Sequence, residues 1–146
     1  MRFIRILPLL FGAALQTVLL GAAQDRGFKV VANVANPLNS LTRAQVSRLF
    51  LKTETTWPSG QLAIPIDLGQ KSDVRASFSR AIHGRDVPAI TSYWQRMIFS
   101  GVSVPPTELA SDEAVLAFVR TNSGAVGYVS ADAALPAQVK VLQVID

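Results

Sequence analysis

Four helix-start signals restrict the folds open to this chain of 146 residues more than any other feature of its sequence. In each signal, a capping residue precedes apolar side chains at helical spacing. The four capping residues are Thr42, Ser72, Asp86 and Ser111. They predict helices over about 43–51, from Ser72 to the terminating Gly84, from Asp86 to about residue 97, and after Ser111. The first helix also has a capping box, because Gln45 lies three residues after Thr42.

Short apolar runs alternate with these helices and indicate strands. The runs cover residues 28–36, 62–67, 125–130 and 138–145. Pro65 indicates that the second run lies at an edge or a strand end, and Pro105-Pro106 indicates a loop without regular structure over 99–110. The order β-α-β-α-α-α-β-β predicts an α/β fold with one mixed sheet flanked by helices.

The first 23 residues have the composition of a secretory signal. Arg2 and Arg5 precede an apolar stretch from Ile6 to Leu20, and Gly21-Ala22-Ala23 offers small residues for cleavage. The alternative is an uncleaved membrane anchor, but the apolar run is shorter than the roughly 20 residues that span a bilayer. We therefore expect a signal peptide at 1–23, a mature domain at 24–146 and a periplasmic location.

Charge and cysteine content narrow the function. Without Arg2 and Arg5 the chain has 12 basic and 10 acidic side chains, and the basic ones are scattered, so we expect no nucleic-acid partner. The chain has no cysteine, which excludes disulfides and thiolate chemistry.

Catalytic motifs are also missing from the sequence. His83 is the only histidine, and at a predicted helix end it is expected to act as a cation that complements the helix dipole. No G-x-S-x-G, G-x-G-x-x-G or P-loop pattern is present. We therefore expect no enzyme activity, no metal and no cofactor.

The stretch QKSDVRASFSR, residues 70–80, allows two interpretations. A helix N-terminus presents unpaired N–H groups and partial positive charge, which suit phosphate or a related oxyanion. The anion-binding residues would then be Ser72, Asp73, Val74 and Arg75, with Arg75 supplying the counter-charge. In the other interpretation Ser72 and Asp73 only cap the helix, and the Asp73 carboxylate repels an anion.

Four stretches in order resemble the phosphate-binding proteins of ABC transporters. They are LTRAQVSRLFLKTETTWPSGQLAIPID, SDVRASF, YWQRMIFSGVSVPP and SGAVGYVS, and the resemblance covers about residues 28–145. It implies a single lobe of a type II periplasmic binding protein fold, and binding of phosphate or a related oxyanion without catalysis. The family typically has Ser-Gly-Thr at the helix start, whereas this chain has Asp73 and Val74 after Ser72.

A second functional hypothesis follows from that difference. The chain is then a protein-interaction or scaffolding module that keeps the lobe, has lost the ligand, and binds a periplasmic or membrane protein partner. An exposed apolar patch around Trp57 or around Val102-Ser103-Val104 would favour this hypothesis. Packing in the core is the alternative interpretation of Trp57.

Overall fold

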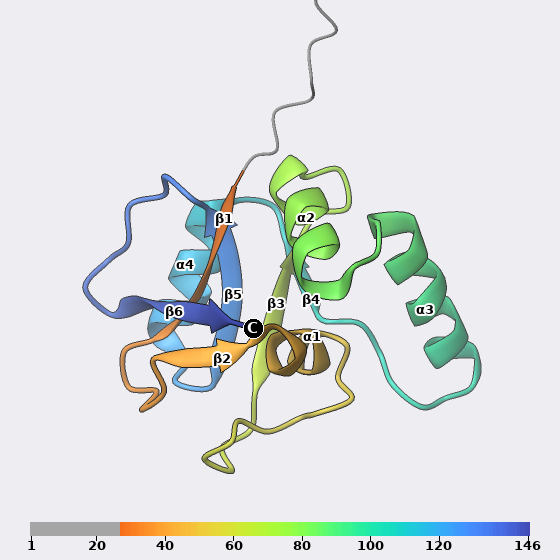
Figure 1. The fold of residues 1–146 in the computed structure, drawn as a ribbon, viewed down its shortest axis with the longest axis horizontal. Coiled ribbons are helices and arrows are strands. Elements are labelled where there is room, and N and C mark those ends of the chain that lie inside the picture. Colours follow the sequence, from red (N-terminus) through yellow and green to blue (C-terminus); the bar gives the residue numbers. More distant parts are fainter. Residues whose placement is uncertain (1–26) are drawn as a thin grey trace, which may run out of the picture.

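The computed structural model describes residues 27–146, so the predicted signal peptide at 1–23 lies outside the described residues (Figure 1). Six strands form one sheet in the order β2-β6-β1-β5-β3-β4. The strands are β1 (Phe28–Asn33), β2 (Ser40–Thr42), β3 (Ile64–Leu68), β4 (Thr107–Leu109), β5 (Ala125–Ser130) and β6 (Val139–Ile145). β1 pairs antiparallel with β5 and β6, and the other pairs are parallel. The predicted mixed sheet is confirmed.

The helices begin where the capping residues predict. They are α1 (Arg43–Phe50), α2 (Asp73–Phe78), the π-helical turn η1 (Ser79–His83), α3 (Val87–Phe99) and α4 (Asp112–Thr121). Each of the four capping side chains accepts a hydrogen bond from the backbone N–H three residues later. Gln45 completes the capping box of α1. Local capping chemistry therefore fixes where these helices begin.

The helix after Ser72 departs from its predicted form. A regular helix was expected up to Gly84, but α2 ends at Phe78 and the chain continues as the wider turn η1. The end itself is as predicted: Gly84 has φ 64°, in the left-handed region that glycine adopts without strain. Beyond it, the Ser79 hydroxyl donates to the Arg85 carbonyl at 2.7 Å.

Two short strands correct the predicted loops. β2 precedes α1, and β4 lies within the stretch 99–110 that was expected to lack regular structure. Both have three residues, and both exist because a neighbouring strand pairs with them. The first predicted strand, 28–36, ends at Asn33. Pro65 lies in β3 opposite Val126 of β5, at the end of β3 that β4 does not reach.

Helices cover both faces of the sheet, and β5 shows how the two faces differ. Successive strand residues point to opposite faces. A Cβ atom at Gly127 would lie 2.7 Å from Val115 Cγ1 of α4, so only glycine allows this close approach. Its neighbour Tyr128 points the other way and stacks on Phe78 of α2, with ring centroids 3.8 Å apart. α4 therefore covers one face, and α1 with α2 covers the other.

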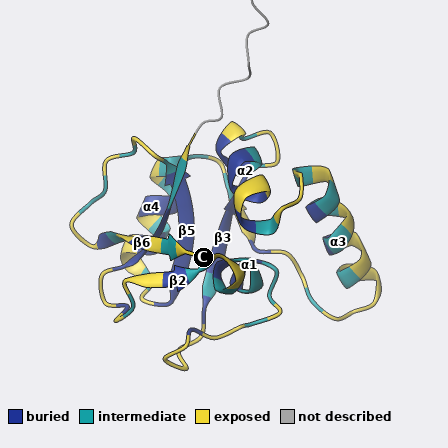
Figure 2. Ribbon diagram, in the orientation of Figure 1, coloured by how far each residue is buried: buried dark blue, intermediate teal, exposed yellow. Residues whose placement is uncertain are grey.

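The main core lies between the sheet and these three helices (Figure 2). Phe50 and Phe28 add further ring contacts to the Phe78–Tyr128 stack. Trp57 is 1% exposed and donates its indole N–H to the Gly124 carbonyl at 2.9 Å. The packing interpretation of Trp57 is therefore confirmed, and its ring is not part of an exposed surface.

The sheet with α1, α2 and α4 forms the sheet body, and helix α3 lies to one side of it (Figure 1). Ile90 and Trp94 are buried, but neither belongs to the main core cluster. Tyr93 of α3 donates to the Leu51 carbonyl at 2.9 Å. Among residues 27–146, no helix is long and apolar enough to span a bilayer.

Candidate anion site and its ion-pair network

The start of α2 holds the four residues predicted to bind an anion. The Ser72 hydroxyl oxygen accepts the backbone N–H of Arg75 at 3.2 Å, and the Ser72 N–H donates to the Gly69 carbonyl at 2.9 Å. Asp73 is exposed, whereas Val74 is buried in the main core. The hydroxyl of Ser72 is thus engaged as a helix cap.

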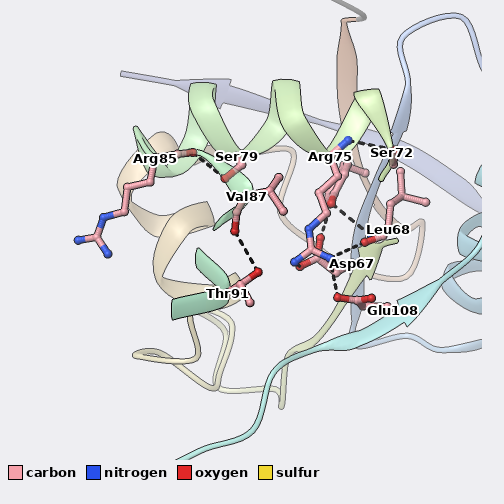
Figure 3. A network of polar contacts seen from close by, with 10 residues as sticks. Asp67, Leu68, Ser72, Arg75, Ser79, Arg85, Val87, Thr91 and Glu108 are labelled. Atoms are coloured by element: carbon pink, nitrogen blue, oxygen red, sulfur yellow. Dashed lines mark hydrogen bonds and ion pairs between the residues drawn. The ribbon is translucent and has the colours of Figure 1, made fainter. Parts of the chain in front are cut away.

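The Arg75 side chain leaves the helix start and runs toward β3 and β4 (Figure 3). Its Nη1 donates to the Leu68 carbonyl at 2.7 Å and to Glu108 Oε1 at 2.6 Å. Its Nη2 lies 3.4 Å from Asp67 Oδ2. Only 5% of the Arg75 side chain is exposed. The guanidinium therefore has two internal carboxyl partners, one buried and one half-exposed.

The pKa values in this cluster follow from burial and from these pairs. Burial raises the pKa of the Asp67 carboxyl, although Arg75 and the Tyr128 hydroxyl act in the opposite direction. Burial alone would lower the pKa of Arg75, but Asp67 and Glu108 raise it overall, so the guanidinium keeps its proton. The positive charge of Arg75 is therefore held between its internal partners.

Tyr128 connects the ion-pair network of Arg75, Asp67 and Glu108 to the aromatic core. Its hydroxyl donates to Asp67 Oδ1 and accepts the Leu68 N–H at 3.2 Å. Burial and the neighbouring Asp67 raise the pKa of Tyr128, so it stays a hydrogen-bond donor. Its ring stacks on Phe78, three residues beyond Arg75 in α2. The network therefore fixes α2 against the sheet at two points.

A cavity of about 140 Å³ lies between this network and α3. Arg75 and Glu108 line it, together with Trp94, Ile98 and Pro105. A neighbouring cavity of about 390 Å³ includes Lys71 and shares Gln70 with the first. Lys71 is exposed, so it is a cation that reaches solvent beside Ser72.

The structure thus separates the four predicted residues. Ser72, Asp73 and the backbone remain at the helix start, while the charge of Arg75 lies in the network. Sequence reasoning missed Asp67, Glu108 and Tyr128, the partners of Arg75. No local pattern links them, because the three lie on β3, β4 and β5. Within the described part of the chain, no group of three or more His, Asp or Glu side chains could hold a metal ion.

His83 corrects a second expectation. It was expected to be a cation at the helix end, but burial, followed by the charges of Arg85 and Arg75, lowers its pKa to about 4. Its Nδ1 lies 2.8 Å from the Ser47 hydroxyl, and its ring packs edge-on against Phe78. His83 is therefore neutral near pH 7 and acts in packing, not through the helix dipole.

Comparison with known proteins identifies the fold. No protein-family model matches the sequence, and no curated protein matches it. An ABC-type phosphate transport receptor from Vibrio cholerae aligns with a TM-score of 0.64 and 22% identity, over 81% of this chain and 46% of that one. A protein from Clostridium perfringens, described as a phosphate ABC transporter substrate-binding protein and solved with bound phosphate, gives a TM-score of 0.65 and 16% identity, over 81% and 44%.

A third structure agrees with these two. It is a protein from Planctomyces limnophilus described as a possible phosphate-binding protein, with a TM-score of 0.58 and 18% identity, over 82% of this chain and 42% of that one. The described chain thus has a solute-binding-like fold and spans less than half the length of these neighbours. The predicted resemblance to a single lobe is confirmed at the level of the fold. Fold alone does not define a ligand.

Proposed function

We propose that this chain is a non-catalytic binding lobe that acts through contact with another protein chain, and that it has lost phosphate binding at the start of α2. One observation carries the proposal: the Arg75 guanidinium is paired internally with Asp67 and Glu108. An anion at the helix start would have to break these pairs or do without the arginine. Both routes cost affinity, because separating a buried ion pair leaves a charge without its partner.

Two features support this proposal. Asp73 adds a negative charge in the first turn of α2, where an oxyanion would have to approach. In the loop after α3, Val102 and Val104 are 71% and 62% exposed, and exposed apolar side chains in this stretch favour contact with a protein. A periplasmic location and a signal peptide at 1–23, ahead of a domain at 24–146, complete the proposal. N-terminal sequencing of the protein from the periplasm tests that part.

The test is isothermal titration of the folded protein with phosphate, sulfate and chloride. We expect no heat of binding for any of the three anions. Ser72→Ala and Arg75→Met are compared in the same titrations, and both should be as silent as the unaltered chain. Phosphate binding that is stronger than sulfate binding and disappears in Ser72→Ala would contradict the loss of the ligand.

Oxyanion recognition is the second candidate, and the exposure of Lys71 favours it. Lys71 lies beside Ser72 and lines the larger cavity, so it could supply the charge that Arg75 withholds. The structural neighbours described as phosphate-binding proteins agree with this candidate. Here phosphate would bind weakly at the backbone of residues 73–75 and Ser72, open to water. Lys71→Ala should abolish such binding while leaving the unfolding midpoint unchanged.

A further inference from the structure

An apolar rim lies at the C-terminal end of α3 and in the loop toward β4. It consists of Ile98, Phe99, Val102 and Val104, which are 52%, 91%, 71% and 62% exposed. Gly101, with φ 68°, turns the chain between the two halves of the rim. Scattered exposed apolar residues are normal, but these four lie within seven positions, and clustering of this kind is a feature of protein contact sites.

The rim borders the candidate site. Ile98 lines the same cavity as Arg75 and Glu108, and Pro105, next to Val104, lines it too. The segment that carries the rim lies at the edge of the molecule, where α3 stands beside the sheet body (Figure 1). A partner seated on the rim would therefore also cover the entrance to the ion-pair network.

The charge pattern of residues 87–107 indicates what kind of partner fits. These 21 residues contain one charged side chain, Arg96, and no acid. In a two-fold contact, residue i of one copy meets residue j of the other and j meets i, so a surface whose charges all have one sign is repelled by its own copy. A nearly uncharged surface avoids that repulsion. An anionic bilayer would instead favour several Lys or Arg residues around the apolar side chains.

The size of the surface fits the same partner. Eighteen of the residues from 87 to 107 are at least partly exposed. A standard protein interface uses about 20–30 residues on each side, with apolar side chains at its centre and polar ones around it, so this segment would supply most of one side. Phe99 lies within this segment, with the polar Gln95, Arg96 and Ser100 nearby in sequence.

We propose that residues 87–107 contact the same segment of a second copy of this chain, with the apolar rim at the centre of a two-fold interface. This inference names the partner in the proposed function and rests on that function. The second copy would bury Phe99 and close the side of the cavity that opens beside Ile98. It would also place two ion-pair networks on either side of one interface.

The test measures the molar mass of the full chain by sedimentation over a wide range of protein concentration. We expect the mass to rise from one chain to two, with little dependence on salt because the contact is apolar. Phe99→Ser combined with Val102→Ser should raise the dimer dissociation constant by roughly thirtyfold or more, as for a central hot spot. Val34→Ser is the matched control: Val34 is 49% exposed but lies next to β1, outside the segment.

All variants carry the same N-terminal segment, so a difference between them reports on the rim. A single-chain mass at every concentration would overturn the inference, as would a dimer that Phe99→Ser and Val102→Ser leave intact. Binding to vesicles of phosphatidylglycerol by a protein that stays monomeric would replace the second copy with a bilayer. The anion titrations are independent: phosphate binding by a dimer would refute the proposed loss of ligand while the interface stands.

Discussion

The sheet body and the segment 87–107 bury their apolar side chains in different ways. In the body, β1, β5, α1, α2 and α4 enclose a continuous core that includes Val31, Val46, Val119 and Tyr128, all fully buried. In the segment, Ile90 and Trp94 anchor α3, while Phe99 and its neighbours face solvent. The body therefore supplies the stability of the fold, and the segment supplies an exposed apolar surface. The ion-pair network borders the segment, because Arg75 and Glu108 line one cavity together with Trp94 and Ile98.

The largest expected effect tests the body. Phe78→Ala removes a ring that contacts Phe28, Phe50 and Tyr128 and is 2% exposed. It should lower the free energy of unfolding by about 3–5 kcal/mol, the range for large aromatic truncations in a core. Urea unfolding followed by circular dichroism measures this. A loss below about 1 kcal/mol would mean that the core does not depend on the stack.

The network should show a somewhat smaller effect. Arg75→Met removes the guanidinium and leaves the buried Asp67 carboxyl without its cation, which should cost about 2–4 kcal/mol. Glu108→Gln is the matched control, and it should cost less than about 1 kcal/mol because the Glu108 side chain is 39% exposed and solvent screens its pair. Thermal unfolding of both variants measures the difference. If both variants lost the same stability, the half-exposed pair of Arg75 with Glu108 would be the dominant interaction of the network.

The next prediction concerns His83 and the loss of folding stability at acid pH. Its pKa is about 4 in the folded chain and 6.5 ordinarily, so between these values the unfolded chain binds more protons. Stability is therefore lost as the pH falls from about 6.5 to about 4, by at most about 3–4 kcal/mol. Asp67 acts in the opposite sense, because its raised pKa favours the folded state as its carboxyl takes up a proton.

His83→Asn isolates this contribution, because the asparagine side-chain amide can either donate to or accept from the Ser47 hydroxyl and does not titrate. Unfolding in urea at a series of pH values should show that the variant loses less stability than the unaltered chain over this window. Parallel pH profiles for the two proteins would show that His83 is not the neutral, packed group that its contacts indicate.

Local chemistry explains what the sequence could reveal of this fold. The four capping residues act within one turn of chain, so Thr42, Ser72, Asp86 and Ser111 are readable without any tertiary information. β2 and β4 were not readable in this way, because each has three residues and owes its form to pairing with β6 or β3. The change from α2 to η1 had no sequence signal that we can identify.

The candidate site was harder to predict for the same physical reason. An arginine one turn into a helix faces several directions, and the sequence does not fix which carboxylate it meets. Asp67 is eight residues before Arg75 and Glu108 is 33 residues after it, and only the alignment of β3 with β4 brings the two together. The neutral state of His83 likewise depends on burial and on distant charges, which a helix-end pattern does not contain.

The smallest effect on stability belongs to the segment, and it separates the two regions most directly. Phe99→Ser changes a side chain that is 91% exposed, so it should alter the free energy of unfolding by less than about 0.5 kcal/mol at concentrations where the chain is monomeric. At higher concentrations the unaltered chain should gain stability through association while the variant does not, because binding to the folded state adds to stability by mass action. Urea unfolding at two protein concentrations measures both quantities. A large loss in the dilute sample would mean that Phe99 supports the fold of a single chain, and that α3 belongs with the body in energetic terms.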